Sequence, residues 1–161
     1  AALAAEPEVL ILDDPTLGLD AVVRRTLLEE LVGELADRGT TILVTTHDLA
    51  GIEGIADRVG IMHEGRLVYD ETMDGLKERF RRLRCVRGDG TSKEAIEAAL
   101  ARLDVAESRH VGAVVDAVVG RADGADIAGF RAAVDVTDLE LEALSLEEIF
   151  VALCGDEAGG A

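Results

Sequence analysis

The first half of the chain alternates short apolar runs with a longer segment of helical periodicity. Residues 9–13 form a continuous apolar run that ends in an aspartate, and residues 40–46 form a second run rich in β-branched side chains. Runs of this kind are typical of strands covered on both faces. The intervening segment, 21–37, has apolar residues at helical spacing, at Val23, Leu27, Leu31 and Leu35. Strand, helix and strand in this order predict a parallel sheet with a crossover helix.

Capping and turn residues mark the limits of these elements. Asp20 is a candidate N-cap for the helix, because its carboxylate is able to accept hydrogen bonds from free amides. Gly39 is expected to end that helix. A short helix is predicted over 48–56. The segment that follows is typical of a hairpin with Glu64 and Gly65 at its turn.

The composition changes near residue 77, and shorter units follow. Residues 77–87 hold six of the sixteen basic residues of the chain and one acidic residue. The remaining pattern predicts strands at 82–87, 105–110, 113–119 and 134–140, and helices at 92–103, 125–133 and 145–154. Taken in chain order, the first six of these seven elements follow the pattern β-α-β-β-α-β, which is the order of a ferredoxin-like sandwich.

The composition describes a globular protein with an acidic surface. A chain of 161 residues is long enough for one domain or two small ones. Hydrophobic residues make up 48% and charged residues 30%, which is typical of a folded chain. With three Phe, one Tyr and no Trp, the cores must consist of aliphatic side chains. The formal net charge of −17 argues against a nucleic-acid partner, because phosphates would be repelled.

The cysteines indicate the redox environment of the protein, and the first residues indicate whether the sequence is a part of a longer chain. Cys85 and Cys154 fit no metal-binding spacing, which favours a reduced cytosolic setting in which both are small buried residues. The sequence shows no membrane-spanning stretch and no signal peptide. Residue 1 is Ala, and the segment before Pro7 is typical of the end of a helix. We therefore expect the chain to be the C-terminal part of a longer protein.

Polar side chains follow both predicted strands of the first half. Asp13 and Asp14 end the first strand, Asp20 lies just beyond it, and His47 follows the second strand. A carboxylate at the end of a buried strand is costly unless a cation or hydrogen-bond donors face it. Ligands of open parallel sheets sit outside the carboxyl ends of the strands, so both clusters are expected at one edge. An acid pair and a histidine there suit Mg²⁺ and a phosphate group.

These motifs, in this order and spacing, make residues 6–70 similar to the C-terminal half of the nucleotide-binding domain of an ABC transporter. VLILD at 9–13 resembles the Walker B strand, and GLD at 18–20 resembles the D-loop. TTHD places His47 at the position of the switch histidine, and residues 56–70 resemble the strand pair that follows it. The resemblance implies part of a P-loop NTPase parallel-sheet domain, with α/β architecture.

The resemblance also implies roles for four residues. Asp13 would organise Mg²⁺ through coordinated water, and His47 would contact the γ-phosphate of ATP. Asp20 would lie at the seam between two nucleotide-binding subunits. Asp14 stands where the family usually has a glutamate that polarises the attacking water. Aspartate is one methylene shorter, so hydrolysis would be slow unless the backbone compensates, since general-base positioning contributes roughly 10²–10⁴-fold in rate.

Three motifs of the family do not occur in the chain. The sequence has no GxxxxGK[ST] phosphate-binding loop, no Q-loop and no LSGGQ-like signature. The family places all three upstream of the Walker B strand. We therefore expect an ATP hydrolase in the full-length protein and an inactive fragment in the 161 residues taken alone.

The end of the chain has a resemblance of its own. ALSLEEIFVAL at 143–153 resembles the tails of ATPases that serve ABC-2-type exporters. The two resemblances together predict two domains. Residues 1–79 would be the C-terminal half of an ABC nucleotide-binding domain, and residues 80–161 would be an accessory α+β domain of ferredoxin-like type.

The leading hypothesis is an ABC transporter subunit that binds and hydrolyses ATP to power export through a separate transmembrane permease subunit. It would work with a second nucleotide-binding subunit, in the cytoplasm and peripheral to the inner face of the cell membrane. One alternative is a catalytically degenerate regulatory subunit of a heterodimeric transporter, marked by Asp14. Another is a soluble ABC ATPase of repair or translation, against which the acidic charge and the exporter-like tail both argue.

The remaining polar and apolar clusters are interpreted as structural. The basic run from Lys77 to Arg87 is either a solvated helix face or a contact with membrane headgroups or the membrane partner, and we favour the first. His63 and His110 are given no functional role. The last helix carries an apolar stripe that we interpret as packing. Its members are Leu144, Leu146, Ile149, Phe150 and Leu153.

Overall fold

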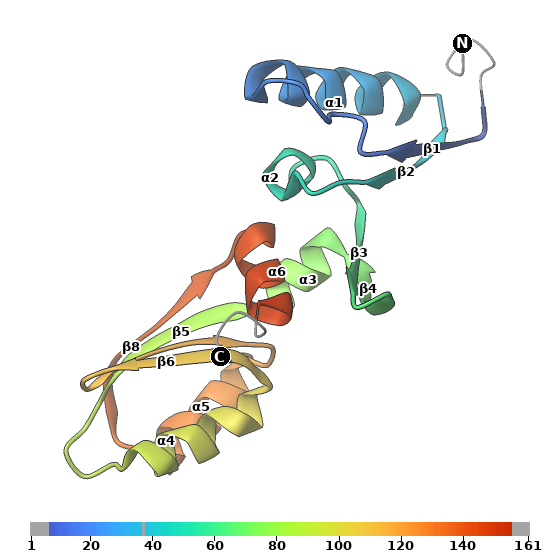
Figure 1. The fold of residues 1–161 in the computed structure, drawn as a ribbon. Helices are drawn as coiled ribbons and strands as arrows, with labels where there is room; N and C mark the ends of the chain where they lie inside the picture. Colours follow the sequence, from blue (N-terminus) through green and yellow to red (C-terminus); the bar gives the residue numbers. More distant parts are fainter. Residues whose placement is uncertain (1–6, 37, 156–161) are drawn as a thin grey trace. The chain divides into compact units, whose positions relative to one another are not determined.

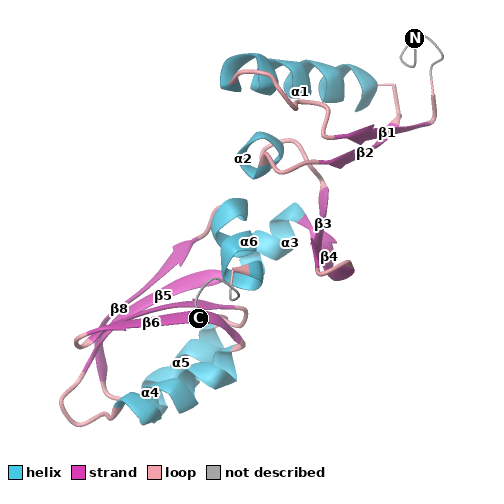
Figure 2. Ribbon diagram, in the orientation of Figure 1, coloured by secondary structure: helices cyan, strands magenta, loops and turns pink. Residues whose placement is uncertain are grey.

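Two compact units make up the fold. The structure is a computed structural model that describes residues 7–36 and 38–155 (Figure 1). Residues up to Ala56 contact mainly one another, and residues from Asp57 onward do the same, so the boundary between the two units lies between Ala56 and Asp57. In the described residues the first unit holds one sheet and the second holds two (Figure 2). The predicted helix end before Pro7 lies outside the described residues.

The first unit is a parallel strand pair with a crossover helix, as the hydrophobic pattern predicted. Its elements are β1 (Val9–Asp13), α1 (Ala21–Ala36), β2 (Thr41–Thr45) and α2 (Leu49–Ile52). The register runs from Val9 opposite Thr41 to Asp13 opposite Thr45. The carboxyl ends of the two strands therefore coincide.

The apolar positions of this unit are buried only in part. On α1, Leu28 and Leu35 are buried, whereas Val23 and Leu27 are 47% and 36% exposed. The predicted stripe is therefore correct at Leu35 and wrong at Val23 and Leu27, while the side chain of Leu31 lies outside the description. The expectation that both faces of β1 and β2 are covered is also wrong for the described residues. One face exposes Val9, Ile11 and Leu43.

The second unit begins with the predicted hairpin. β3 (Arg58–His63) pairs with β4 (Arg66–Thr72) in antiparallel register. Glu64 and Gly65 have φ of 48° and 74°, as a two-residue type I′ turn requires. α3 (Met73–Arg79) follows directly, and the side chain of Thr72 caps it by accepting a hydrogen bond from Gly75 N.

A four-stranded antiparallel sheet forms the larger part of this unit. Its strands lie in the order β6-β7-β5-β8. They span β5 (Arg81–Arg87), β6 (Val105–Val111), β7 (Val114–Val119) and β8 (Val136–Ala143). Helices α4 (Lys93–Leu100) and α5 (Gly124–Ala133) lie on one side of the sheet, and α6 (Leu146–Cys154) lies on the other (Figure 1). A short 3₁₀ helix, η2 (Ala101–Leu103), follows α4.

The core between this sheet and α4 and α5 is mainly aliphatic, as the composition predicted. It includes Leu83, Ile96, Leu100, Val115 and Val119, all essentially inaccessible to solvent, with Phe130 as the aromatic member. Cys85 belongs to the same cluster, and burial raises the pKa of its thiol to about 11. This cysteine is therefore an inert core residue at neutral pH.

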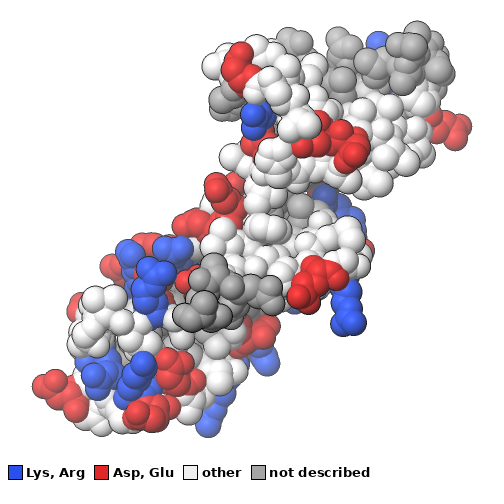
Figure 3. All heavy atoms as spheres, in the orientation of Figure 1, with Lys and Arg blue, Asp and Glu red and all other residues white. Residues whose placement is uncertain are grey.

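The basic run at 77–87 is shared between α3 and β5, and three of its arginines face carboxylates. Arg79 pairs with Glu71 at 3.2 Å, Arg82 with Glu148 at 3.2 Å, and Arg84 with Asp116 at 2.9 Å. Figure 3 accordingly shows basic and acidic side chains interspersed over the visible face of this unit. The prediction of a solvated helix face is wrong in detail, because most of the run lies on a strand.

The last helix packs as its sequence pattern predicted. Ser145 and Glu148 form a capping box at its start, in which each side chain bonds the backbone N–H of the other. Leu144, Leu146 and Ile149 are buried. The interpretation of this stripe as packing is consistent with that burial.

The boundary between the two compact units, after Ala56, and the domain boundary predicted from the sequence, after residue 79, lead to different expectations for the stability of the C-terminal fragment. Phe80 is buried and packs edge-on against the ring of Tyr69, with ring centroids 5.5 Å apart. Residues 80–161 lack Tyr69, whereas residues 57–161 keep it. We expect urea unfolding to show the longer fragment more stable by at least about 1 kcal/mol, from the lost aromatic pair and newly exposed apolar area. Equal stabilities would instead favour the boundary after residue 79.

Candidate functional site

The carboxyl ends of β1 and β2 bring the two polar clusters of the first unit together. Asp13 lies directly opposite Thr45 in the parallel register. Just beyond the strands, Asp14 N donates to Thr45 O at 2.8 Å. The residues that follow each strand therefore meet at one edge, which was the expectation from the sequence.

Asp14 and His47 form the closest acid–histidine contact of this edge. His47 Nδ1 lies 2.9 Å from Asp14 Oδ2. The imidazole side chain is 68% exposed, whereas the Asp14 side chain is 24% exposed. The other carboxylate oxygen, Asp14 Oδ1, is buried and has no hydrogen-bond partner among the described residues. Buried acceptors are usually hydrogen-bonded, so an unpartnered one distinguishes this residue from an ordinary strand end.

The backbone at Asp14 adopts an uncommon conformation. Its φ is 42°, in the left-handed region that Asp and Asn enter more readily than other non-glycine residues. This conformation turns the chain sharply after β1. A longer side chain at this position would have to adopt the same strained backbone.

Asp13 is held by a residue to which the sequence analysis gave no role. The Thr45 hydroxyl donates to Asp13 Oδ1 and also accepts from Asp14 N at 3.3 Å. One hydroxyl thus contacts both members of the acid pair. The strand register is the signal that identifies Thr45, because only the alignment of β1 with β2 places it opposite Asp13.

Asp20 does not take part in these contacts. Its Oδ1 accepts from Val22 N and Val23 N, both at 3.0 Å, so the carboxylate caps the start of α1. The capping role proposed from the sequence is therefore correct. A role at a seam between subunits stays a prediction.

Arg24 and Asp48 connect the loops on either side of the site, and neither was singled out from the sequence. Arg24 Nη2 donates to Leu19 O at 2.9 Å, and Nη1 lies 3.7 Å from Asp48 Oδ2. Asp48 in turn caps α2 by accepting from Gly51 N at 3.2 Å. This chain of contacts fixes the loop after β1 to the loop after β2.

The donor set at this edge fits a magnesium ion that is shared with a phosphate. Mg²⁺ is usually bound by one or two carboxylates together with waters and substrate oxygens, and does not need a cage of protein ligands. Asp13 offers an exposed carboxylate, and Asp14 Oδ1 is an unpartnered acceptor. Within the described ranges, no group of three or more His, Cys, Asp or Glu side chains able to hold a metal occurs.

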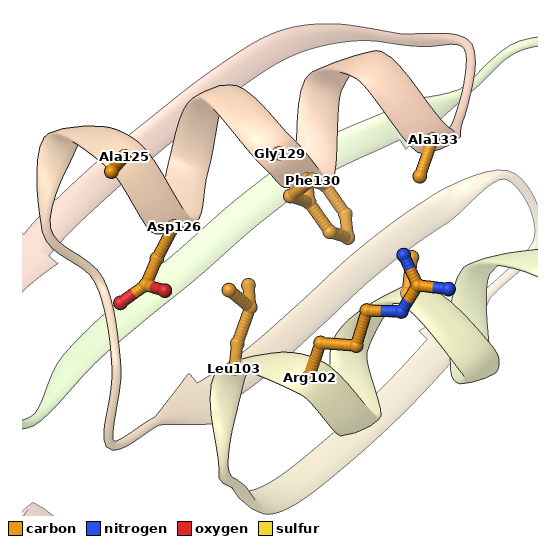
Figure 4. Close-up of a pocket in the computed structure, with 8 residues that line it drawn as sticks. Arg102, Leu103, Ala125, Asp126, Gly129, Phe130 and Ala133 are labelled. Atoms are coloured by element: carbon orange, nitrogen blue, oxygen red, sulfur yellow. The ribbon is translucent and has the colours of Figure 1, made fainter.

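Other candidates lie in the second unit. A cavity of about 160 Å³ lies between η2 and α5 (Figure 4). Its lining includes the small residues Ala99 and Gly129, the ring of Phe130, and the charged residues Arg102 and Asp126. His110 Nε2 lies 2.5 Å from Glu97 Oε1, which ties β6 to α4. These features show packing and pairing and do not indicate a ligand.

Comparison with known proteins identifies the relatives of the chain. Residues 1–52, which include the whole candidate site, match the family model described as "AAA domain, putative AbiEii toxin, Type IV TA system". The ABC transporter ATP-binding protein YtrB of Bacillus subtilis is 42% identical over 77 residues, which cover 48% of this chain and 26% of YtrB.

Two further relatives carry names related to export or drug resistance. A fluoroquinolones export ATP-binding protein of Mycobacterium tuberculosis is 41% identical over 98 residues, which cover 59% of this chain and 32% of the relative. The daunorubicin resistance ATP-binding protein DrrA3 of Streptomyces coeruleorubidus is 33% identical over 165 residues, which cover 98% of this chain and 51% of DrrA3. The chain thus spans about half the length of DrrA3 and less of the other two.

The cap at α1 gives a test that needs no ligand. Replacing Asp20 by Ala removes the acceptor for two amides, which costs about 1 kcal/mol at an N-cap. We expect hydrogen exchange at the amides of Val22 and Val23 to accelerate roughly fivefold in Asp20→Ala, as that free energy implies. Asp20→Asn is the matched control and should keep the protection. Unchanged exchange in Asp20→Ala would show that the cap does not hold the helix start.

Proposed function

We propose that this chain, whose homologues are ABC transporter ATP-binding proteins, is part of a subunit that binds and hydrolyses ATP to power export through a separate membrane subunit. The observation that carries the proposal is the contact between Asp14 and His47 beside Asp13 at the carboxyl ends of β1 and β2. An acid pair and a histidine at one sheet edge suit phosphoryl transfer, in which positioning and charge stabilisation dominate.

Each residue of the edge has a part in the proposed reaction. Asp13, oriented by the Thr45 hydroxyl, would hold Mg²⁺ through coordinated water. Bound Mg²⁺ would supply positive charge for the phosphate oxygens. Asp14 would orient the attacking water through Oδ1, the oxygen that has no partner. His47 would hold the γ-phosphate through Nε2, because Asp14 fixes its Nδ1 side.

The same geometry supports the second candidate, a degenerate regulatory subunit. The short Asp14 side chain already shares one oxygen with His47, so only one remains for water. Such a site would bind nucleotide in a complex with an active subunit and hydrolyse it slowly. Turnover measurements on the longer protein distinguish the two candidates.

We assign the second half of the chain to an accessory domain of ferredoxin-like type, with its start near residue 80. The order β-α-β-β-α-β and the antiparallel strand order β6-β7-β5-β8 support this assignment. The near-complete alignment with DrrA3, over 98% of this chain, supports the view that both halves belong to one kind of subunit.

The proposed partners are a transmembrane permease subunit and a second nucleotide-binding subunit, with no nucleic acid. The proposed location is the cytoplasm, at the inner face of the cell membrane. The names of the relatives, which include a fluoroquinolones export protein, support the connection to transport. Within the described ranges, no helix combines the length and apolar character needed to cross a membrane.

Replacement of Asp14 tests the assignment of the water-orienting residue. In a full-length protein with a phosphate-binding loop, Asp14→Asn keeps the size and loses the charge, so ATP turnover at saturating Mg-ATP should fall roughly 10²-fold or more. Asp13→Asn is the comparison and should weaken metal-dependent ATP binding as well. Unchanged turnover in Asp14→Asn would remove Asp14 from this role and favour the degenerate subunit.

The variant Asp14→Glu distinguishes the effect of side-chain length on ATP turnover from the effect of backbone strain on stability. The longer side chain should raise turnover if reach limits the reaction. The left-handed backbone at this position, with φ of 42°, opposes glutamate more than aspartate, so part of the gain should be offset by lower thermal stability. Turnover and melting temperature measured on the same preparation reveal both effects. A fall in turnover without loss of stability would contradict the reach argument.

The 161-residue chain alone should bind ATP weakly. Its candidate site offers contacts to the metal and the terminal phosphate only, and the sequence has no GxxxxGK[ST] loop for the other phosphates. Calorimetric titration with Mg-ATP should give a dissociation constant weaker than roughly 100 μM, which corresponds to about −5.5 kcal/mol. Micromolar binding would show that other residues of this chain hold the nucleotide.

A further inference from the structure

The two edges of the four-stranded sheet differ in charge. β6 is one edge strand and β8 is the other. Among the described residues, no strand pairs with the outer side of either. An unpaired edge is a template for another strand, and proteins commonly protect it with charged side chains, prolines or β-bulges. The edge charges therefore indicate which side is open to a partner.

β8 is protected against a second copy of itself. Its outward-facing positions include Glu140 and Glu142, which lie opposite Arg84 and Arg82 of β5 in the sheet. Asp138, in the same strand, has a φ of 50° at an irregularity of the pairing. Antiparallel pairing of two β8 strands about residue 139, 140 or 141 would bring acidic side chains opposite one another. Like charges directly opposite destabilise a sheet.

β6 also has an irregularity of its pairing, between Val105 and Glu107, and beyond it carries a balanced and self-complementary charge pattern. Glu107 and Arg109 lie on the same face of the sheet, opposite Val118 and Asp116 of β7. Ser108 stands between them and is exposed. A two-fold axis perpendicular to the sheet relates each face of one copy to the same face of the other. Directly opposite residues must then be on the same face, so the axis must lie midway between two copies of the same residue. An axis at Ser108 puts Glu107 opposite Arg109 of the other copy, and Arg109 opposite Glu107.

Neighbouring registers are unfavourable for the same reason. An axis at Glu107 would place two glutamates opposite each other, and an axis at Arg109 would place two arginines opposite each other. Charge therefore selects the register centred on Ser108. Arg109 is 74% exposed and Glu107 is 43% exposed, and the two form an ion pair at 3.7 Å within one copy, which the pairing across the axis would exchange for two ion pairs between copies.

We propose that β6 is a homodimer edge, at which two copies of this chain pair antiparallel about Ser108 to form one continuous eight-stranded sheet. The contact is isologous, as a two-fold interface requires. β6 carries one acid, Glu107, and one arginine, Arg109, in a protein of net charge −17. It is thus an edge at which two such acidic molecules approach with little repulsion. The contact goes beyond the proposed ATP hydrolysis and does not require nucleotide.

Charge reversal with mixing tests the pairing. In Glu107→Arg alone, arginine would face arginine, and in Arg109→Glu alone, glutamate would face glutamate. Each variant should raise the dimer dissociation constant of the 161-residue chain at least about tenfold by sedimentation equilibrium. An equimolar mixture of the two should restore association to within about threefold of the parent, because every pair is then of opposite sign. Matched controls are Glu140→Arg on β8 and Arg131→Glu on α5, which should leave the dissociation constant unchanged.

If the dimer is too weak for sedimentation equilibrium, a disulfide between the two copies of β6 tests the same pairing. In a Cys154→Ser background, Ser108→Cys would place two thiols across the axis, where directly opposite Cβ atoms are about 4.5–5.5 Å apart. We expect mild oxidation to give a covalent dimer, and the control Thr137→Cys on β8 to give at least about tenfold less. The proposal is overturned if Ser108→Cys gives no more dimer than Thr137→Cys, if association is indifferent to both charge reversals, or if the mixture does not recover. Binding of an unrelated strand at β6 in place of a second copy would also overturn it.

Discussion

The parallel pairing of β1 with β2 is the constraint on which the candidate site depends. The pairing aligns Asp13 with Thr45, and everything at the edge follows from that alignment. A shift by one residue would turn the Thr45 hydroxyl away from the acid pair, because side chains alternate between the faces of a strand. The contact of Asp14 with His47 is therefore a result of strand register, although neither residue lies within a strand.

The elements and the location of the site could be predicted from the sequence because they depend on local patterns. The apolar run at 9–13, the Glu64-Gly65 turn and the alternation in the second half each carry a period or a turn signal that acts over a few residues. The edge at which Asp13, Asp14 and His47 gather followed from a general rule for parallel sheets. The relatives then confirmed the resemblance to ABC transporter ATP-binding proteins.

Other features required the three-dimensional structure. The role of Thr45 depends on register, and the left-handed backbone of Asp14 has no signal in sequence beyond the residue type. The exposure of Val23 and Leu27 depends on which side of α1 meets the sheet, and a helical stripe permits a rotation of one position. The pairing of Arg84 with Asp116 joins residues that are 32 positions apart in the chain. The sequence around the basic run therefore contains no sign of this partner.

The place of β5 in the sheet has a consequence for the order in which the chain acquires structure on the ribosome. β5 is a central strand, yet both of its partners come later in the chain, since Arg84 lies opposite Asp116 and Glu140. The nascent strand must therefore remain without neighbours until β7, at Val114–Val119, has been made. Arginine at positions 81, 82, 84 and 87 keeps such an unpaired strand from joining another nascent chain, because like charges repel along the whole segment. Two of these arginines, Arg82 and Arg84, later pair with the carboxylate of Asp116 across the sheet, so they serve both the intermediate and the final fold.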